Sequence, residues 1–149
     1  MKKEIENFVK NSRVAVFSVL RKDGNPHGAT LHMSSKDDVS EIYFFTEKAY
    51  RKSEALLEGG EIPATVVIGF SEHEMKTLQL DGTAQVVGKE DLLEVQNIHF
   101  GKIKEAETYK DEPGMYFIRF IPTWWRYTVW GEDNNGEKTK DIICSEDEG

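Results

Sequence analysis

The clearest pattern along the chain is the alternation of apolar and polar side chains between residues 76 and 87. Every second residue from Leu78 to Val86 is apolar or glycine, and the residues between them are polar. A period of two residues is typical of a strand with one buried face. Glycine interrupts the apolar face at Gly82. We therefore predict a long, bent strand that serves two parts of a barrel, with its bend at Gly82.

Other segments predict strands because they are rich in β-branched and aromatic residues. These segments are residues 14–20, 27–33, 42–46, 62–70 and 115–130. The Asp23-Gly24 pair predicts a hairpin between the first two segments. The run from 62 to 70 is continuously apolar, which predicts a strand buried on both faces. In the last segment, Pro122 predicts a bulge or a break.

Helices are predicted between these strands. Residues 2–11 have an apolar stripe, and residues 89–100 carry acidic side chains in their first turn. Residues 103–110 predict a second helical piece, and residues 50–60 predict a helix that follows the third strand. A hairpin start and the lack of GxGxxG argue against a doubly wound α/β fold. The expected fold is mainly β, an antiparallel barrel with helical insertions.

Two adjacent cations, Arg51 and Lys52, stand where this third-strand helix is expected to begin. Cations at a helix N-terminus oppose the helix dipole, at a cost of a few tenths of a kcal/mol. An anion held between them would remove that cost. The pattern therefore makes this turn a candidate phosphate site. The alternative is a pair of solvated side chains with Glu54 and Glu58 as partners.

Composition limits the classes of function. The chain has 149 residues and a formal net charge of −8, which argues against nucleic acid or an anionic membrane as the main partner. The single cysteine, Cys144, excludes an internal disulfide, and no apolar run has the length of a signal or membrane segment. We expect a cytoplasmic protein with one domain over residues 1–131 and a mobile acidic tail over residues 132–149.

The histidines do not have metal-ligand spacing, and no pairing of cysteine or serine with a base indicates covalent catalysis. We therefore predict no metal site and assign no catalytic residue. His32 is the one histidine considered for a functional role, although a structural role is favoured for it.

Three segments together resemble a known family. They are DGNPHGATLHM (residues 23–33), FFTEKAYRKSEAL (44–56) and LQLDGTAQVV (78–87). Their order and spacing resemble the pyridoxamine 5′-phosphate oxidase-like, FMN-binding split-barrel proteins, in the general-stress-protein-like branch. The resemblance implies a six-stranded antiparallel split β-barrel that forms a homodimer with FMN at the subunit interface. It covers nearly the whole chain.

The resemblance also implies which residues bind FMN. Arg51 and Lys52 would hold the phosphate, while Phe45 and Thr46 would lie along the ribityl chain or ring edge. Further contacts would come from the second strand, the long alternating strand and the aromatic cluster at 124–127. The implied cofactor-binding residues outside the phosphate turn are Ala29, Thr30, Leu31, His32, Phe45, Thr46, Thr77, Gln79 and Trp125.

The chain departs from the oxidase members of that family. Ala29 and Ser34 stand where those members carry Arg and Lys, and Tyr50 replaces the Ser of Ser-Arg-Lys. The C-terminal Arg-x-His signature is absent from WWRYTVW (residues 124–130). Each lost charged hydrogen bond is worth roughly 1.5–3 kcal/mol. True pyridoxamine phosphate oxidase activity is therefore not expected.

The expected function is that of an FMN flavoprotein, an oxidoreductase acting on a small-molecule substrate that the sequence does not name. One alternative is a non-catalytic or stress-related flavin-binding module. Another is a relative that binds haem or a deazaflavin. A third is a β-barrel interaction domain without a cofactor.

Overall fold

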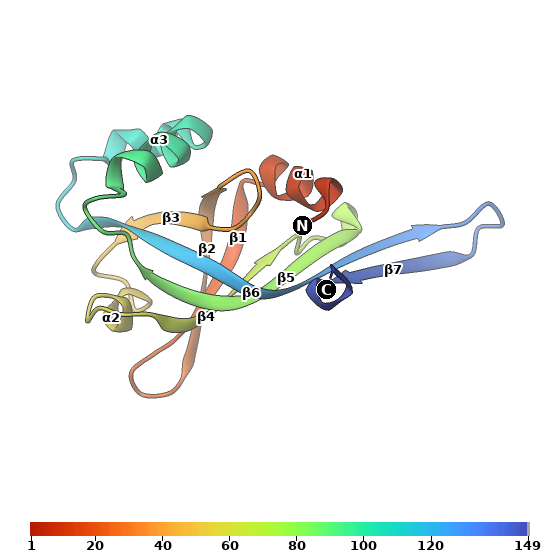
Figure 1. The fold of residues 1–149 in the computed structure, drawn as a ribbon, viewed down its shortest axis with the longest axis horizontal. Coiled ribbons are helices and arrows are strands. Elements are labelled where there is room, and N and C mark those ends of the chain that lie inside the picture. Colours follow the sequence, from red (N-terminus) through yellow and green to blue (C-terminus); the bar gives the residue numbers. More distant parts are fainter. Residues whose placement is uncertain (149) are drawn as a thin grey trace.

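A computed structural model describes residues 1–148, and seven antiparallel strands form its sheet (Figure 1). The strands are β1 (Val14–Leu20), β2 (Pro26–Ser35), β3 (Ile42–Glu47), β4 (Ile62–Ile68), β5 (Lys76–Val86), β6 (Met115–Glu132) and β7 (Lys138–Cys144). Their order in the sheet is β3-β2-β1-β4-β5-β6-β7, and β3 also pairs with β6. The first six strands therefore close a ring, which confirms the predicted class of six-stranded split barrel.

The ring is split between β2 and β3. These strands pair only through residues 33–35 and 42–44. Beyond that point β3 pairs with β6 through Phe45, Thr46 and Glu47, while β2 continues along β1. The ladder is consequently interrupted between residues 26–32 of β2 and the end of β3, and we call this interruption of strand pairing the opening of the barrel.

Short helices lie around the ring. They are α1 (Lys3–Asn11), α2 (Ser53–Leu56) and α3 (Leu92–Lys102), with 3-10 turns η1 (Glu72–Glu74), η2 (Lys104–Tyr109) and η3 (Ser145–Glu148). The first helix and α3 confirm their predictions. The helix predicted over residues 50–60 is wrong in length, because only four residues are helical and they begin after Lys52.

The main core fills the barrel, and alternate residues of each strand contribute to it. Phe17, Val66 and Leu80 lie in neighbouring strands and are at most 1 % exposed. A second apolar cluster lies between α3 and the outer side of β3 and β6, and contains Tyr43 and Phe117. Strand β4 has one buried face, not two as predicted. Its residues are alternately buried and at least partly exposed, and the exposed residues lie on the outer side of the sheet, as do those of its neighbour β1.

The bend in β5 is where the alternating pattern predicts it. The register of β5 against β6 shifts between Asp81 and Gly82, and Thr123 is the extra residue on β6 between Pro122 and Trp124. A Cβ atom on Gly82 would lie 2.1 Å from the carbonyl oxygen of Ile121. Glycine is therefore required where the two backbones approach each other, and the bulge predicted at Pro122 is confirmed.

The segment predicted as a mobile tail contains an additional strand. Residues 138–144 pair with residues 126–132 of β6, and the β6–β7 hairpin extends away from the barrel (Figure 1). Its turn is stabilised by Asp133, whose carboxylate accepts hydrogen bonds from the amides of Asn135 and Glu137. Residue 149, which belongs to the predicted tail, lies outside the described residues.

The contact at Gly82 gives a test of the bend. We expect Gly82→Ala to lower the free energy of unfolding by about 2–3 kcal/mol, because the added methyl group displaces the β6 backbone. Chemical denaturation measures this change. The matched control is Gly101→Ala in α3, where a Cβ meets nothing within 4 Å, so a gain of up to about 1 kcal/mol is expected. Equal stability of Gly82→Ala and wild type would contradict the close approach.

Candidate functional site

The turn after β3 is fixed to the barrel by a small set of hydrogen bonds. The Lys48 amide donates to the carbonyl oxygen of Gly114 at 2.9 Å. The Ser53 hydroxyl donates to the Glu47 carbonyl oxygen at 2.9 Å and lies 2.5 Å from the hydroxyl of Tyr116, which donates to it. These bonds connect the turn to both β3 and β6. The residues between Lys48 and Ser53 are thereby held at the opening of the barrel.

Lys52 is a buried cation in this turn. The residue is 3 % exposed, and its Nζ atom lies 4.3 Å from the centre of the Tyr50 ring. Among the side chains that the structure describes, those of residues 1–146, its ammonium group has neither an ion-pair nor a hydrogen-bond partner. Burial lowers the pKa of Lys52, and the charge of Glu47 partly opposes that effect. A buried ammonium without a carboxylate partner favours an anionic ligand.

The neighbouring Arg51 is exposed. Neither cation stands inside a helix, since α2 begins at Ser53 and has only four residues. The Ser53 amide is already bonded to the Tyr50 carbonyl oxygen at 3.0 Å. The predicted helix N-terminus is therefore wrong as a source of free amides. The positive charge of this turn therefore comes from the side chains of Arg51 and Lys52 and not from a helix N-terminus.

The second strand borders the same opening. Ala29 and Leu31 are half-buried and point toward the barrel interior, while Thr30 and His32 are exposed on the outer side. Between residues 26 and 32, β2 has a ladder partner only on the β1 side in the described chain. The other edge of this backbone carries N–H and C=O groups that no strand pairs. Such an edge can pair with another backbone or with a ligand that carries donors and acceptors.

The end of β3 contributes two different side chains. Thr46 is 3 % exposed and faces the barrel interior in phase with the core residue Phe44. Phe45 faces the other way and stacks on Phe117 with ring centres 4.5 Å apart, beneath α3. Phe45 can therefore border the opening only through its backbone.

Three other predicted cofactor residues are not brought to the turn. The Thr77 hydroxyl donates to the Ile68 carbonyl oxygen at 3.2 Å, which joins the start of β5 to the end of β4. Gln79 faces outward from β5 and accepts hydrogen bonds from Arg126. Trp125 is 7 % exposed and belongs to the main core. Its ring therefore lies inside the barrel and not on an outer face, and its contact with a cofactor stays a prediction.

A family model described as pyridoxamine 5′-phosphate oxidase matches residues 1–129. The chain belongs to the pyridoxamine 5′-phosphate oxidase family. No curated protein matches the sequence.

Solved structures share the fold of this family member at low identity. A haem-binding protein from Mycobacterium smegmatis has a TM-score of 0.72 and 13 % identity, covering 97 % of this chain and 57 % of its own. A putative general stress protein 26 from Jannaschia sp. has a TM-score of 0.65 and 15 % identity, covering 94 % and 96 %. An FMN-binding, pyridoxamine 5′-phosphate oxidase-related protein from Nostoc punctiforme has a TM-score of 0.60 and 11 % identity, covering 93 % and 90 %.

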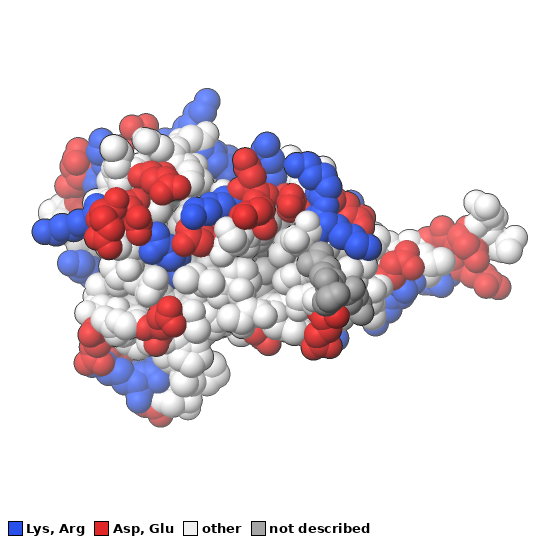
Figure 2. Space-filling model, in the orientation of Figure 1, with Lys and Arg blue, Asp and Glu red and all other residues white. Residues whose placement is uncertain are grey.

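These comparisons show the family and the fold. Solved structures that share this fold thus include an FMN-binding protein and a haem-binding protein. The chain spans little more than half the length of the mycobacterial protein. Among the residues described, no helix is long and apolar enough to cross a bilayer. The face of the molecule shown in Figure 2 mixes acidic and basic side chains without a large basic area.

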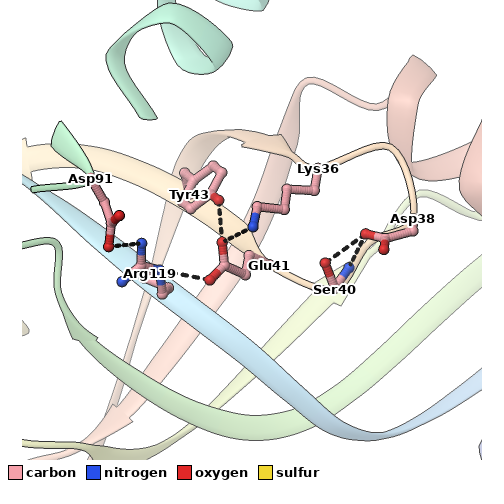
Figure 3. A network of polar contacts seen from close by, with 7 residues as sticks. All are labelled: Lys36, Asp38, Ser40, Glu41, Tyr43, Asp91 and Arg119. Atoms are coloured by element: carbon pink, nitrogen blue, oxygen red, sulfur yellow. Dashed lines mark hydrogen bonds and ion pairs between the residues drawn. The ribbon is translucent and has the colours of Figure 1, made fainter. Parts of the chain in front are cut away.

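A polar network that the sequence did not reveal lies on the outer side of β3 and β6 (Figure 3). The carboxylate of Glu41 is bonded by the Tyr43 hydroxyl, lies 3.0 Å from the Lys36 ammonium and lies 2.9 Å from Nε of Arg119. The Arg119 Nη2 atom also lies 3.1 Å from Asp91, which precedes α3. Each of these charged groups has an internal partner. The network therefore connects α3 to the sheet and is a structural feature.

His99 is the buried histidine of this family member. It is 1 % exposed, and its Nδ1 atom lies 2.7 Å from the hydroxyl oxygen of Ser34. Burial among the aromatic rings beneath α3 lowers its pKa to about 4, with a smaller contribution from His32. The ring is neutral near pH 7 and stabilises the second core. The sequence favoured a structural role for His32, but His32 is exposed. The histidine with a structural role in the core is His99.

The network at Arg119 predicts a large effect on stability. We expect Arg119→Ala to lower the free energy of unfolding by about 3 kcal/mol, because Glu41 keeps its charge and loses the less exposed of its two cationic partners. Urea denaturation measures the loss. In the exposed ion pair between Arg13 and Glu105, Arg13→Ala should cost less than about 1 kcal/mol. Equal losses in the two variants would show that the network does not hold α3.

The lowered pKa of His99 predicts a pH dependence of stability. The unfolded chain binds a proton below about pH 6.5, whereas the folded chain resists protonation until about pH 4. Stability is therefore complete above pH 6.5 and falls toward pH 4, by about 3 kcal/mol in total for this group. Denaturation at pH 7, 5.5 and 4.5 should show a flatter profile for His99→Asn than for wild type. A matching variant at the exposed His73, His73→Asn, should keep the wild-type slope, and identical slopes in all three proteins would refute the assignment.

Proposed function

We propose that this member of the family is an FMN-binding flavoprotein whose phosphate site is the turn at residues 48–52. The observation that carries the proposal is Lys52, an ammonium group that is buried at the opening of the barrel without a carboxylate partner in the described part of the chain. Arg51, exposed beside it, supplies a second positive charge. Two cations, of which Lys52 forms no ion pair with a described carboxylate, fit a phosphate monoester better than a neutral ligand.

The rest of the opening fits an elongated planar group. The backbone edge of β2 between Ala29 and His32 has donors and acceptors that could pair with the pyrimidine edge of a flavin. Thr46 and the apolar side chain of Leu31 line the interior side. In this arrangement the charged turn binds the phosphate and the β2 edge orients the ring. A bound flavin supplies the two-electron redox chemistry, so the site needs no acid–base pair from the protein.

A ring held at the β2 edge would remain exposed to water on the side away from the barrel. A second copy of the chain placed over the opening would exclude that water, and we therefore propose a homodimer with FMN at its interface. The substrate in this proposal is a small molecule that stacks on the exposed side of the flavin. The resulting activity is that of a flavin-dependent oxidoreductase.

Haem is the second candidate, and one observation favours it. His32 is exposed on the outer side of β2, at the border of the opening, where its imidazole is accessible to a metal ion. The mycobacterial protein of the same fold binds haem. The two candidates differ in their absorbance spectra, because bound flavin makes the purified protein yellow, while haem shows a Soret band. His32→Ala should remove haem binding and leave the phosphate turn intact.

The phosphate assignment predicts the behaviour of a double variant. We expect Arg51→Ala with Lys52→Ala to weaken FMN binding at least tenfold, since each charged hydrogen bond contributes roughly 1.5–3 kcal/mol. Quenching of flavin fluorescence during titration of the apoprotein measures the affinity. The matched control is Lys138→Ala with Lys140→Ala in β7, which makes the same change in net charge away from the turn. Unchanged affinity in the first variant, or equal weakening in both, would reject the assignment.

A further inference from the structure

The outer side of the barrel carries one continuous row of side chains. Thr30, Val16, Val67, Gln79 and Arg126 are direct neighbours in register across β2, β1, β4, β5 and β6. All five point away from the core, because the residues next to them in each strand are the inward-facing ones. The row therefore places a single arginine at one end of a strip that is otherwise neutral.

Arg126 is held in one orientation by Gln79. Its Nε and Nη2 atoms donate to the Gln79 side-chain oxygen at 3.1 and 2.7 Å. These two donors form the side edge of the guanidinium group. The remaining edge, formed by Nη1 and Nη2, still carries two parallel N–H groups. This second edge is oriented before any ligand arrives.

Arg126 has no acidic partner among the side chains that the structure describes, which are those of residues 1–146. Within them no carboxylate oxygen lies within 4 Å of Arg126, and Nη1 takes part in no hydrogen bond. The guanidinium carbon lies 6.0 Å from the centre of the Trp124 ring. Arg126 and Trp124 line a hollow of about 340 Å³ together with Thr65, Val67 and Asp81. A fixed guanidinium edge, an indole ring and an aliphatic floor thus meet in one depression.

The surrounding charges select the ligand. Asp81 lies in the same hollow, and the carboxylate of Glu146 accepts a hydrogen bond from Nε1 of Trp124 at 3.1 Å. These two carboxylates disfavour a doubly charged anion such as phosphate. A carboxylate carries one charge and matches the planar edge of arginine with two parallel hydrogen bonds. We propose that the hollow at Arg126 binds a small aromatic monocarboxylate, with its carboxylate on the Nη1–Nη2 edge and its ring against Trp124.

This inference goes beyond the FMN proposal and does not require it. The hollow is formed by β4, β5 and β6, and none of its residues belongs to the turn that contains Lys52. Binding of the carboxylate is therefore expected with or without flavin. If both proposals hold, the hollow binds an aromatic acid on the outer face of a protein that also carries out a flavin-dependent reaction.

Benzoate is a suitable probe, and inorganic phosphate is the matched anion. We expect benzoate to change the tryptophan fluorescence of the purified full-length protein saturably, and phosphate to bind at least tenfold more weakly. Arg126→Ala should weaken benzoate binding about tenfold or more. Gln79→Glu should do the same while keeping side-chain size and the bond to Arg126, because its carboxylate neutralises the guanidinium. Arg13→Ala, in an exposed ion pair elsewhere, is the control and should leave benzoate affinity unchanged.

Three outcomes would overturn the inference. One is equal affinity for benzoate and phosphate, and another is full benzoate affinity in Gln79→Glu. The third is absence of benzoate binding together with a change of oligomeric state in Arg126→Ala, which would assign this face to contact with a second copy. FMN affinity is measured in the same variants by a separate titration. A loss of FMN binding concerns the phosphate turn and not the hollow at Arg126. Thermal melts confirm that each variant is folded.

Discussion

The pairing of β3 with β6 is the constraint on which the rest of the structure depends. Six residue pairs join these strands, from Ile42 with Phe120 to Glu47 with Met115. Because β3 turns toward β6, it leaves β2 after a short contact, and the barrel opens between them. The same pairing brings Tyr116 to Ser53 and fixes the turn that contains Lys52. The pairing that closes the ring therefore also positions the residues of the candidate site.

Local patterns predicted the strands well where one physical requirement dominates. The alternation along β5 predicted its inward face, and the glycine within it marked the bend because no side chain fits against the β6 backbone at Gly82. The Asp23-Gly24 turn predicted the first hairpin. Strand β7 was missed because its composition is that of a solvated tail, and it forms only where β6 extends past the ring. The helix after β3 was overestimated because its amides are used by turn hydrogen bonds.

The candidate site was predictable in part. Resemblance to the family indicated Arg51 and Lys52, but the burial of Lys52 depends on tertiary packing that no local pattern contains. For Gln79 and Trp125 the sequence predicted cofactor contact, and the structure shows an arginine partner for the first and the core for the second. Contacts between distant segments, such as Gln79 with Arg126, leave no mark in either segment alone.

We propose that the buried ammonium group of Lys52 binds the phosphate of FMN. Burial lowers its pKa in the free protein, and a bound dianion would raise it. Nuclear magnetic resonance of the lysine side chains, titrated with pH before and after addition of FMN, measures that pKa directly. We expect the pKa of Lys52 to be lowered without FMN and to increase clearly when FMN is bound. A pKa of Lys52 that FMN leaves unchanged would contradict it.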